Sequence, residues 1–271
     1  MTDNPVRVLQ TSEDSKELMK AAVALARSKE PADHDTLLKH LRTQSFLSRL
    51  DTKEDYAAAA AKRLRISRVL EALGKNDAPS ARQTIVALTQ ERTFLEEEER
   101  VVALIEASTE VRPPPPALVR FWDAHSQPED GFTPVTITAL VNNGTAPALD
   151  LLERKMADPK HEDDVKIAWM RSRILTHRND LLLLQSCERM LTGVLPSHLR
   201  PALVEVLFDY RPGEWYRPAN ASRPPDRRQA SAAALAQLRR LGYLALQTVQ
   251  LTESQKEAVT KTLEEIEKFN K

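Results

Sequence analysis

Apolar residues recur at helical spacing along most of the chain. The clearest segment is 53–73, KEDYAAAAAKRLRISRVLEAL, in which Ile66, Leu70 and Leu73 share one face of a helix. Gly74 follows directly, and glycine is common just beyond the last turn of a helix. The pattern therefore predicts an amphipathic helix that ends at this glycine.

Further segments with the same spacing are joined by short polar stretches and indicate about a dozen helices. Thr133 followed by Pro134 predicts an N-cap with proline at the first helical position, and Gly144 stops that helix. The most strand-like stretch, 135–138, lies inside this helical pattern. A content of only 6 glycines and 5% aromatic residues also favours helices over sheets. The predicted fold class is all-α.

A run of prolines, VRPPPP at 111–116, interrupts the helical pattern. Consecutive prolines cannot form a helix interior and favour an extended conformation. We expect a frayed N-terminus over 1–12, a helical part over 13–110, a stiff connector at 111–116 and a second helical part over 117–271. We expect the two helical parts to form one continuous body, although the connector could separate two bodies or dock a proline-binding domain.

One stretch carries a repeat-like motif. The sequence GTAPALDLLERKMADPKHEDDVKIAWMRSRIL, 144–175, has a turn with Asp158 and Pro159, and its second helix opens with Asp164, Val165, Lys166 and Ala168. This stretch resembles a HEAT repeat, and 76–88, with Arg82 in the basic position, is a weaker echo. The resemblance implies an α-α superhelix, a HEAT-like solenoid of antiparallel helices in which stacked pairs form a concave surface.

The charge balance narrows the class of partner. Lysine plus arginine equals aspartate plus glutamate, 39 each, so the formal net charge is zero. Nucleic-acid binders usually carry a basic excess, because phosphate contacts supply most of their affinity. Nucleic acid is therefore an unfavoured partner. We find neither an apolar run long enough to cross a membrane nor an apolar leader, and we expect a cytoplasmic protein with no membrane partner.

Motifs that would indicate catalysis or a cofactor were not found. HEDD at 161–164 places a histidine beside three carboxylates, but consecutive helical side chains diverge, which favours a helix N-terminus over a metal site. The sequence has no glycine-rich nucleotide loop and no GxSxG motif. The single cysteine, Cys187, lies at helical spacing among leucines, which is typical of a buried residue. We predict no cofactor, no metal and no catalytic residue.

A basic stripe lies on the helix predicted over 53–73. In KRLRISR, 62–68, the side chains of Lys62, Arg65 and Arg68 spread over about a third of the helix circumference. Such a stripe can contact phosphate or an acidic partner. It can equally be the solvated face of an amphipathic helix, since acidic residues are nearby.

The segment LFDYRPGEWYRPANASRPPDRR, 207–228, differs from the rest of the chain in its aromatic residues, prolines and arginines. Its RPGE sequence predicts a type II turn. Arginine combined with tryptophan and tyrosine is typical of binding hot spots. Arg178, at another turn between helices, could share this surface. The candidate protein-binding residues are Tyr210, Arg211, Trp215, Tyr216, Arg217, Arg227, Arg228 and Arg178. The alternative is a structural plug whose aromatic rings fill a groove between helices.

The leading functional hypothesis is a non-catalytic scaffold that binds a protein partner through its concave face, the 207–228 segment, or both. The alternative is a DNA glycosylase that removes alkylated bases, an activity known among HEAT-like solenoids. The chain has residue types such enzymes use, namely Trp122, Asp123, Trp169, Trp215 and Arg217. No motif of these enzymes matches residue by residue.

Overall fold

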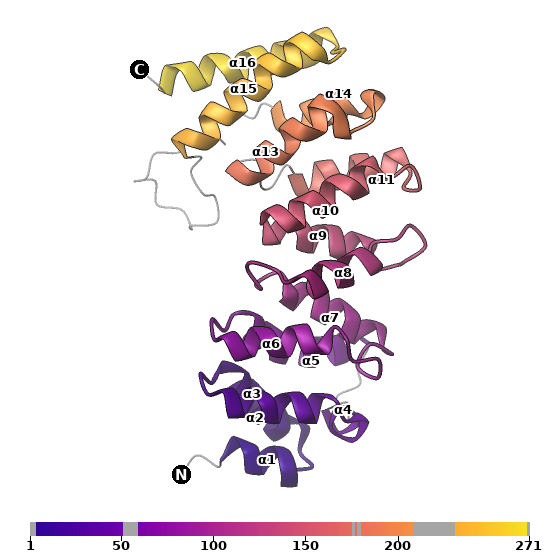
Figure 1. Ribbon diagram of the computed structural model, residues 1–271, viewed down its shortest axis with the longest axis vertical. Helices are drawn as coiled ribbons and strands as arrows, with labels where there is room; N and C mark the ends of the chain where they lie inside the picture. Colours follow the sequence, from indigo (N-terminus) through magenta and orange to yellow (C-terminus); the bar gives the residue numbers. More distant parts are fainter. Residues whose placement is uncertain (1–3, 51–58, 175–176, 178–179, 209–230, 270–271) are drawn as a thin grey trace. The chain divides into compact units, whose positions relative to one another are not determined.

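The structure is a computed structural model that describes residues 4–50, 59–174, 177, 180–208 and 231–269 (Figure 1). Within these ranges every regular element is a helix, so the predicted all-α class is confirmed. The helices divide into two compact units, 1–139 and 140–271. In the described part of the chain no helix combines the length and apolarity needed to cross a membrane.

The first unit is built from short helices connected by tight turns. Its elements are α1 (Pro5–Thr11), α2 (Ser15–Arg27), α3 (Pro31–Leu41), α4 (Gln44–Leu50), α5 (Ala59–Gly74), α6 (Pro79–Leu88), α7 (Glu98–Ser108), α8 (Pro116–Ala124) and the first part of α9 (Thr133–Asn143). Helix α2 packs against α1, α3 and α5, and α5 also packs against α6 and α7. Leucine, isoleucine and alanine residues from these helices form the buried core.

The N-terminal segment expected to be frayed contains helix α1. The side chain of Asn4 accepts a hydrogen bond from the Val6 amide at 3.0 Å, and Pro5 occupies the first turn, where its missing N–H is not needed. Leu9 is fully buried. Arg49 donates to the carbonyls of Leu9 and Ser12 at the end of α1, both at 2.9 Å. A capped and partly buried helix thus lies within the segment that was expected to be irregular.

The end of α5 is fixed by close packing. A Cβ atom added to Gly74 would lie 2.5 Å from the carbonyl oxygen of Ala107 in α7. The predicted helix end at Gly74 is confirmed, but the glycine is required for the approach of two helices and its φ is not positive. Gly144, by contrast, has a φ of 64° where α9 ends, which is the expected left-handed stop.

The proline run lies within the first unit. It joins α7 to α8, and Pro116 is the first residue of α8. The division between the units falls instead inside α9. The start of α9 also needs a correction, because Thr133 is its first helical residue, and its hydroxyl donates to the Gln127 carbonyl at 2.6 Å instead of capping the helix.

The second unit contains two 17-residue helices near its end and two π-helical turns. Its elements are the end of α9, α10 (Ala146–Ala157), α11 (Asp163–Trp169), a π-turn (Met170–Ile174), α13 (Leu181–Arg189), a π-turn (Met190–Val194), a 3₁₀ turn (Ser197–Leu199), α14 (Arg200–Phe208), α15 (Ala232–Thr248) and α16 (Glu253–Phe269). Helix α13 packs against α10 and α15, and α16 packs against α14 and α15. The motif at 144–175 thus spans a helix, a turn containing Asp158 and Pro159, and a second helix.

A candidate basic groove between α2 and α5

The candidate residues proposed from the sequence lie outside the described part of the chain. They are Tyr210, Arg211, Trp215, Tyr216, Arg217, Arg227, Arg228 and Arg178. Whether the 207–228 segment is a recognition surface or a structural plug therefore stays a prediction. Phe208, the last residue of α14, is buried in the core.

The basic stripe of α5 divides into residues with different roles. Arg65 is buried, and its Nη1 donates a hydrogen bond to the Leu50 carbonyl at the end of α4. A cation at this position satisfies a helix C-terminal carbonyl that lacks a partner within its own helix. Arg68, one turn later, is exposed and lines a pocket. Among the described side chains of the stripe, Arg68 is therefore the one available to a ligand, and the side chain of Lys62 lies outside the described residues.

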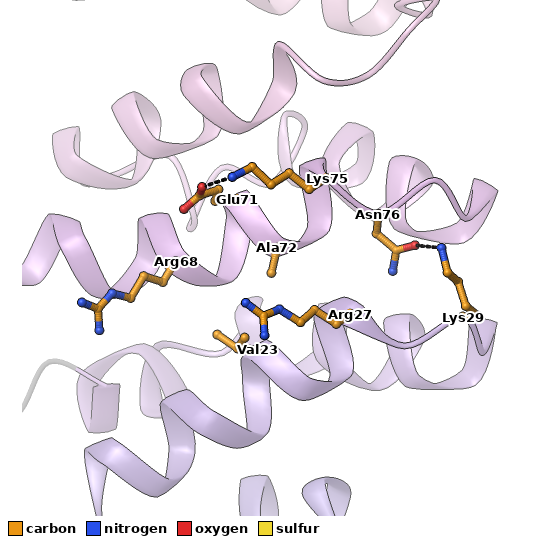
Figure 2. Close-up of a pocket in the computed structure, with 8 residues that line it drawn as sticks. All are labelled: Val23, Arg27, Lys29, Arg68, Glu71, Ala72, Lys75 and Asn76. Atoms are coloured by element: carbon orange, nitrogen blue, oxygen red, sulfur yellow. Dashed lines mark hydrogen bonds and ion pairs between the residues drawn. The ribbon is translucent and has the colours of Figure 1, made fainter. Parts of the chain in front are cut away.

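The pocket is a groove of about 400 Å³ between α2 and α5 (Figure 2). From α2 and the residues after it, the groove is lined by Val23, Arg27 and Lys29. From α5 and the turn after it, the groove is lined by Arg68, Glu71, Ala72, Lys75 and Asn76. Its volume is within the range of known ligand sites, roughly 300 to 1,000 Å³. We refer to it as the α2–α5 groove.

Two of the four cations in the groove are neutralised by acidic neighbours. Lys75 pairs with Glu71 one turn earlier, and this hydrogen bond is the main reason why the pKa of Lys75 is raised. Lys29 pairs with Asp77 and also contacts Oδ1 of Asn76 at 3.3 Å. All four charged side chains are well exposed, so these two ion pairs are weak and exchangeable.

The other two cations, Arg27 and Arg68, are exposed and have no hydrogen bond or ion pair with any residue that the structure describes. They come from different helices, and Val23 and Ala72 provide apolar surface between them (Figure 2). A guanidinium group with free N–H donors can bind a carboxylate or phosphate in two-pronged fashion. The groove thus combines available positive charge with a small apolar surface at Val23.

A buried polar network holds the end of the groove. The Nδ2 of Asn76 donates to the carbonyls of Ala26 and Ser28, at 2.8 and 2.6 Å, and its Oδ1 accepts from the Ala78 amide at 3.0 Å. These bonds connect the C-terminal ends of α2 and α5 and the start of α6. Ala26 is buried and Ser28 is partly buried, so losing these bonds would leave at least one buried carbonyl without this partner.

The same network includes His34, which is fully buried in α3. Its Nε2 lies 3.3 Å from Nδ2 of Asn76, and its Nδ1 lies 2.7 Å from the hydroxyl oxygen of Ser80. The two N–H bonds of the Asn76 amide already serve the Ala26 and Ser28 carbonyls, so the shorter contact of His34 is the one to Ser80. The Ser80–His34–Asn76 contacts tie α3 to the start of α6 and to the turn after α5.

The tryptophans considered for the glycosylase hypothesis belong to the core. Trp122 is fully buried and donates its Nε1–H to the hydroxyl of Ser108 at 2.8 Å. Trp169 is 6% exposed and packs edge-on against His161 at 5.0 Å between ring centroids. Neither side chain is positioned to stack on an extruded base. Among the described residues, no three His, Cys, Asp or Glu side chains converge as metal ligands.

Cys187 in α13 is fully buried, as predicted. Burial, supported by the nearby negative charge of Glu153, raises the pKa of its thiol to about 12. The reactive form of cysteine is the thiolate, so this residue is inert in the folded protein.

Sequence reasoning considered Arg68 but did not consider Arg27, Lys29 or Asn76. The i, i+4 spacing of Glu71 and Lys75 is a further local signal in this region. Comparisons with protein-family models, with curated proteins and with solved structures found no match to this chain.

Proposed function

We propose that this protein is a non-catalytic scaffold that binds a protein partner, and that the partner docks in the α2–α5 groove. One observation carries the proposal: Arg27 and Arg68 line the same groove from two helices, and no described residue neutralises them. Arginine is enriched among residues that dominate binding energy at protein interfaces.

The physical basis is that an exposed charge in water costs little free energy when no protein group pairs with it. An exposed guanidinium in water needs no protein partner, so the fold gains little by neutralising Arg27 or Arg68. Their positive potential is therefore available to attract an acidic surface and to accelerate encounter with it. The buried Asn76 network holds α2 and α5 in place, which reduces the ordering that binding would require.

The HEAT-like solenoid is the finer part of this proposal. The helix–turn–helix at Ala146–Trp169 supports it, since the motif residues Asp158 and Pro159 fall in the turn. In such a solenoid, partner-binding residues are distributed over several repeats. The 207–228 segment then remains a second candidate contact for the same partner.

The test is affinity capture from the source cell's extract with mild chemical crosslinking, read by mass spectrometry. The wild type is compared with an Arg27→Glu, Arg68→Glu double variant. The matched control is Lys39→Glu with Arg92→Glu, two exposed cations of the same unit that lie outside the groove. Both variants change the net charge equally. We expect a specific partner to be retained by the wild type and by the control and lost by the groove variant.

Two results would count against the proposal. Retention of the same partners by the groove variant would exclude the groove as the docking site. A small-molecule substrate turned over by the purified protein would contradict the non-catalytic role. Circular dichroism and a thermal melt of each variant establish that the fold is intact.

A further inference from the structure

We infer that the α2–α5 groove binds an extended acidic peptide segment, in which several carboxylates are distributed along the chain. This inference rests on the proposed function and specifies the chemistry of the partner. The lining contains four cations and a single carboxylate, Glu71. Asp77 neutralises Lys29 from outside the lining, so the surplus positive charge belongs to Arg27 and Arg68.

The distribution of the cations favours an extended ligand. Figure 2 shows Arg68, Arg27 and Lys29 at successive positions along the groove, not converging on one point. A single phosphate ion is held best by donors that converge on its oxygens. A row of separate cations instead matches carboxylates that are spaced along a polypeptide.

The two existing ion pairs allow the groove to adapt. The pairs Lys75–Glu71 and Lys29–Asp77 join exposed side chains, and exposed pairs contribute little to stability. An incoming carboxylate can therefore compete for either lysine without a large loss elsewhere. Arg27 and Arg68 provide the first contacts, and the lysines extend the site toward Asn76.

The small apolar surface of the groove is a second feature of the site. Ala72 is 8% exposed and Val23 is partly exposed, and both line the groove between the cationic positions. Val23 therefore offers a small apolar contact beside the cations, while Ala72 is nearly buried. A small aliphatic residue between the carboxylates of an acidic peptide can contact Val23.

The test uses a fluorescein-labelled peptide of alternating glutamate and valine, titrated with the full-length protein and read by fluorescence anisotropy. The comparison peptide replaces every glutamate with glutamine. We expect the glutamate peptide alone to bind the wild type, with an affinity that falls as salt is added. The Arg27→Gln, Arg68→Gln variant should bind at least about tenfold more weakly, and a Lys39→Gln, Arg92→Gln control should bind like the wild type.

Several outcomes would overturn the inference. Equal binding of the glutamine peptide would show that charge is not recognised. Equal weakening in the control variant would show that binding is general electrostatic attraction. Displacement of the peptide by millimolar inorganic phosphate, or tighter binding of a single-stranded oligonucleotide, would assign the groove to phosphate chemistry.

The failure of the inference is distinguishable from the failure of the proposed function. If partner capture depends on Arg27 and Arg68 but no acidic peptide binds, the scaffold stands and the acidic chemistry is wrong. If acidic peptides bind at the groove but capture is unaffected by its loss, the inferred chemistry stands and the docking site of the partner lies elsewhere.

Discussion

The contact between α10 and α13 and the groove between α2 and α5 differ in whether their charged side chains are paired. In the second unit, the carboxylate of Glu153 accepts hydrogen bonds from Nε and Nη2 of Arg189 at 3.0 and 2.6 Å, and from the Ser186 hydroxyl at 2.7 Å. The side chain of Glu153 is only 9% exposed. In the groove, the exposed Arg27 and Arg68 have no such partner among the described residues.

The difference has a simple electrostatic cause. A carboxylate taken out of water must be matched by donors, or its desolvation destabilises the fold. The hydrogen bonds from Arg189 therefore offset the desolvation cost of the Glu153 carboxylate and stabilise the fold. A guanidinium in an open groove keeps its hydration and needs no protein partner. An unmatched charge beside a groove is consequently a better indication of a binding site than a count of charged residues.

The largest expected effect tests this contrast directly. Arg189→Met should destabilise the protein by about 3 kcal/mol, because it leaves the buried Glu153 without its main donor. Arg27→Met should change stability by less than about 0.5 kcal/mol, since it is exposed and makes no polar contact with the described residues. Urea unfolding followed by circular dichroism measures both. Equal effects of the two substitutions would remove the distinction between the two sites.

The next prediction compares two members of the polar network at the end of the groove. Asn76→Ala should cost about 2 to 3 kcal/mol, because the Ala26 and Ser28 carbonyls lose a buried donor. Ser80→Ala, which removes one partner of His34, should cost less. Urea unfolding gives the order of the two effects. If Asn76→Ala were as mild as a surface change, the network would not hold the groove.

Helix contacts in the two units can be compared through their glycines. Gly74→Ala places a methyl group 2.5 Å from the Ala107 carbonyl oxygen, a backbone atom that cannot rotate away. Gly242→Ala places one 2.8 Å from Cδ2 of Leu263, a side chain that can change rotamer. We expect about 1 to 3 kcal/mol of destabilisation at Gly74 and less at Gly242. Thermal melts of both variants test this order. A greater loss of stability in Gly242→Ala than in Gly74→Ala would contradict it.

The smallest expected effect concerns accessibility. Cys187 should not react with a thiol reagent in the native protein near neutral pH, because it is fully buried and its pKa is raised to about 12. An Arg27→Cys variant should gain one rapidly reacting thiol in the groove. Since the unfolded chain loses the Cys187 proton at lower pH than the folded protein does, stability should also fall as pH rises above about 9. Rapid labelling of Cys187 without denaturant would contradict the sealed packing of α13.

Much of the fold follows from local pattern, as two elements illustrate. The spacing of Ile66, Leu70 and Leu73 predicted α5, whose end at Gly74 is observed. The leucines around Cys187 predicted a buried helix face, which α13 provides. Both rest on the 3.6-residue period, which is written in the sequence itself. Helix α1 was missed although its signal, Asn4 followed by Pro5, was present.

The candidate site could not be predicted in the same way. Arg65 and Arg68 belong to one basic stripe, yet Arg65 is buried against a carbonyl of α4 while Arg68 remains exposed in the groove. Arg27 lies far away in the sequence and joins the groove only because α2 packs against α5. No local pattern specifies which helices become neighbours.

The sequence by itself determined that this chain is helical and where most helices begin and end, since caps, glycines, prolines and apolar spacing act within a few residues. Only the tertiary structure decided which charges are neutralised and which remain available. The strength of an ion pair and the free-energy cost of desolvating a charge both depend on the neighbours that packing brings together. Glu153 with Arg189 and the unmatched Arg27 with Arg68 are the two results of that packing.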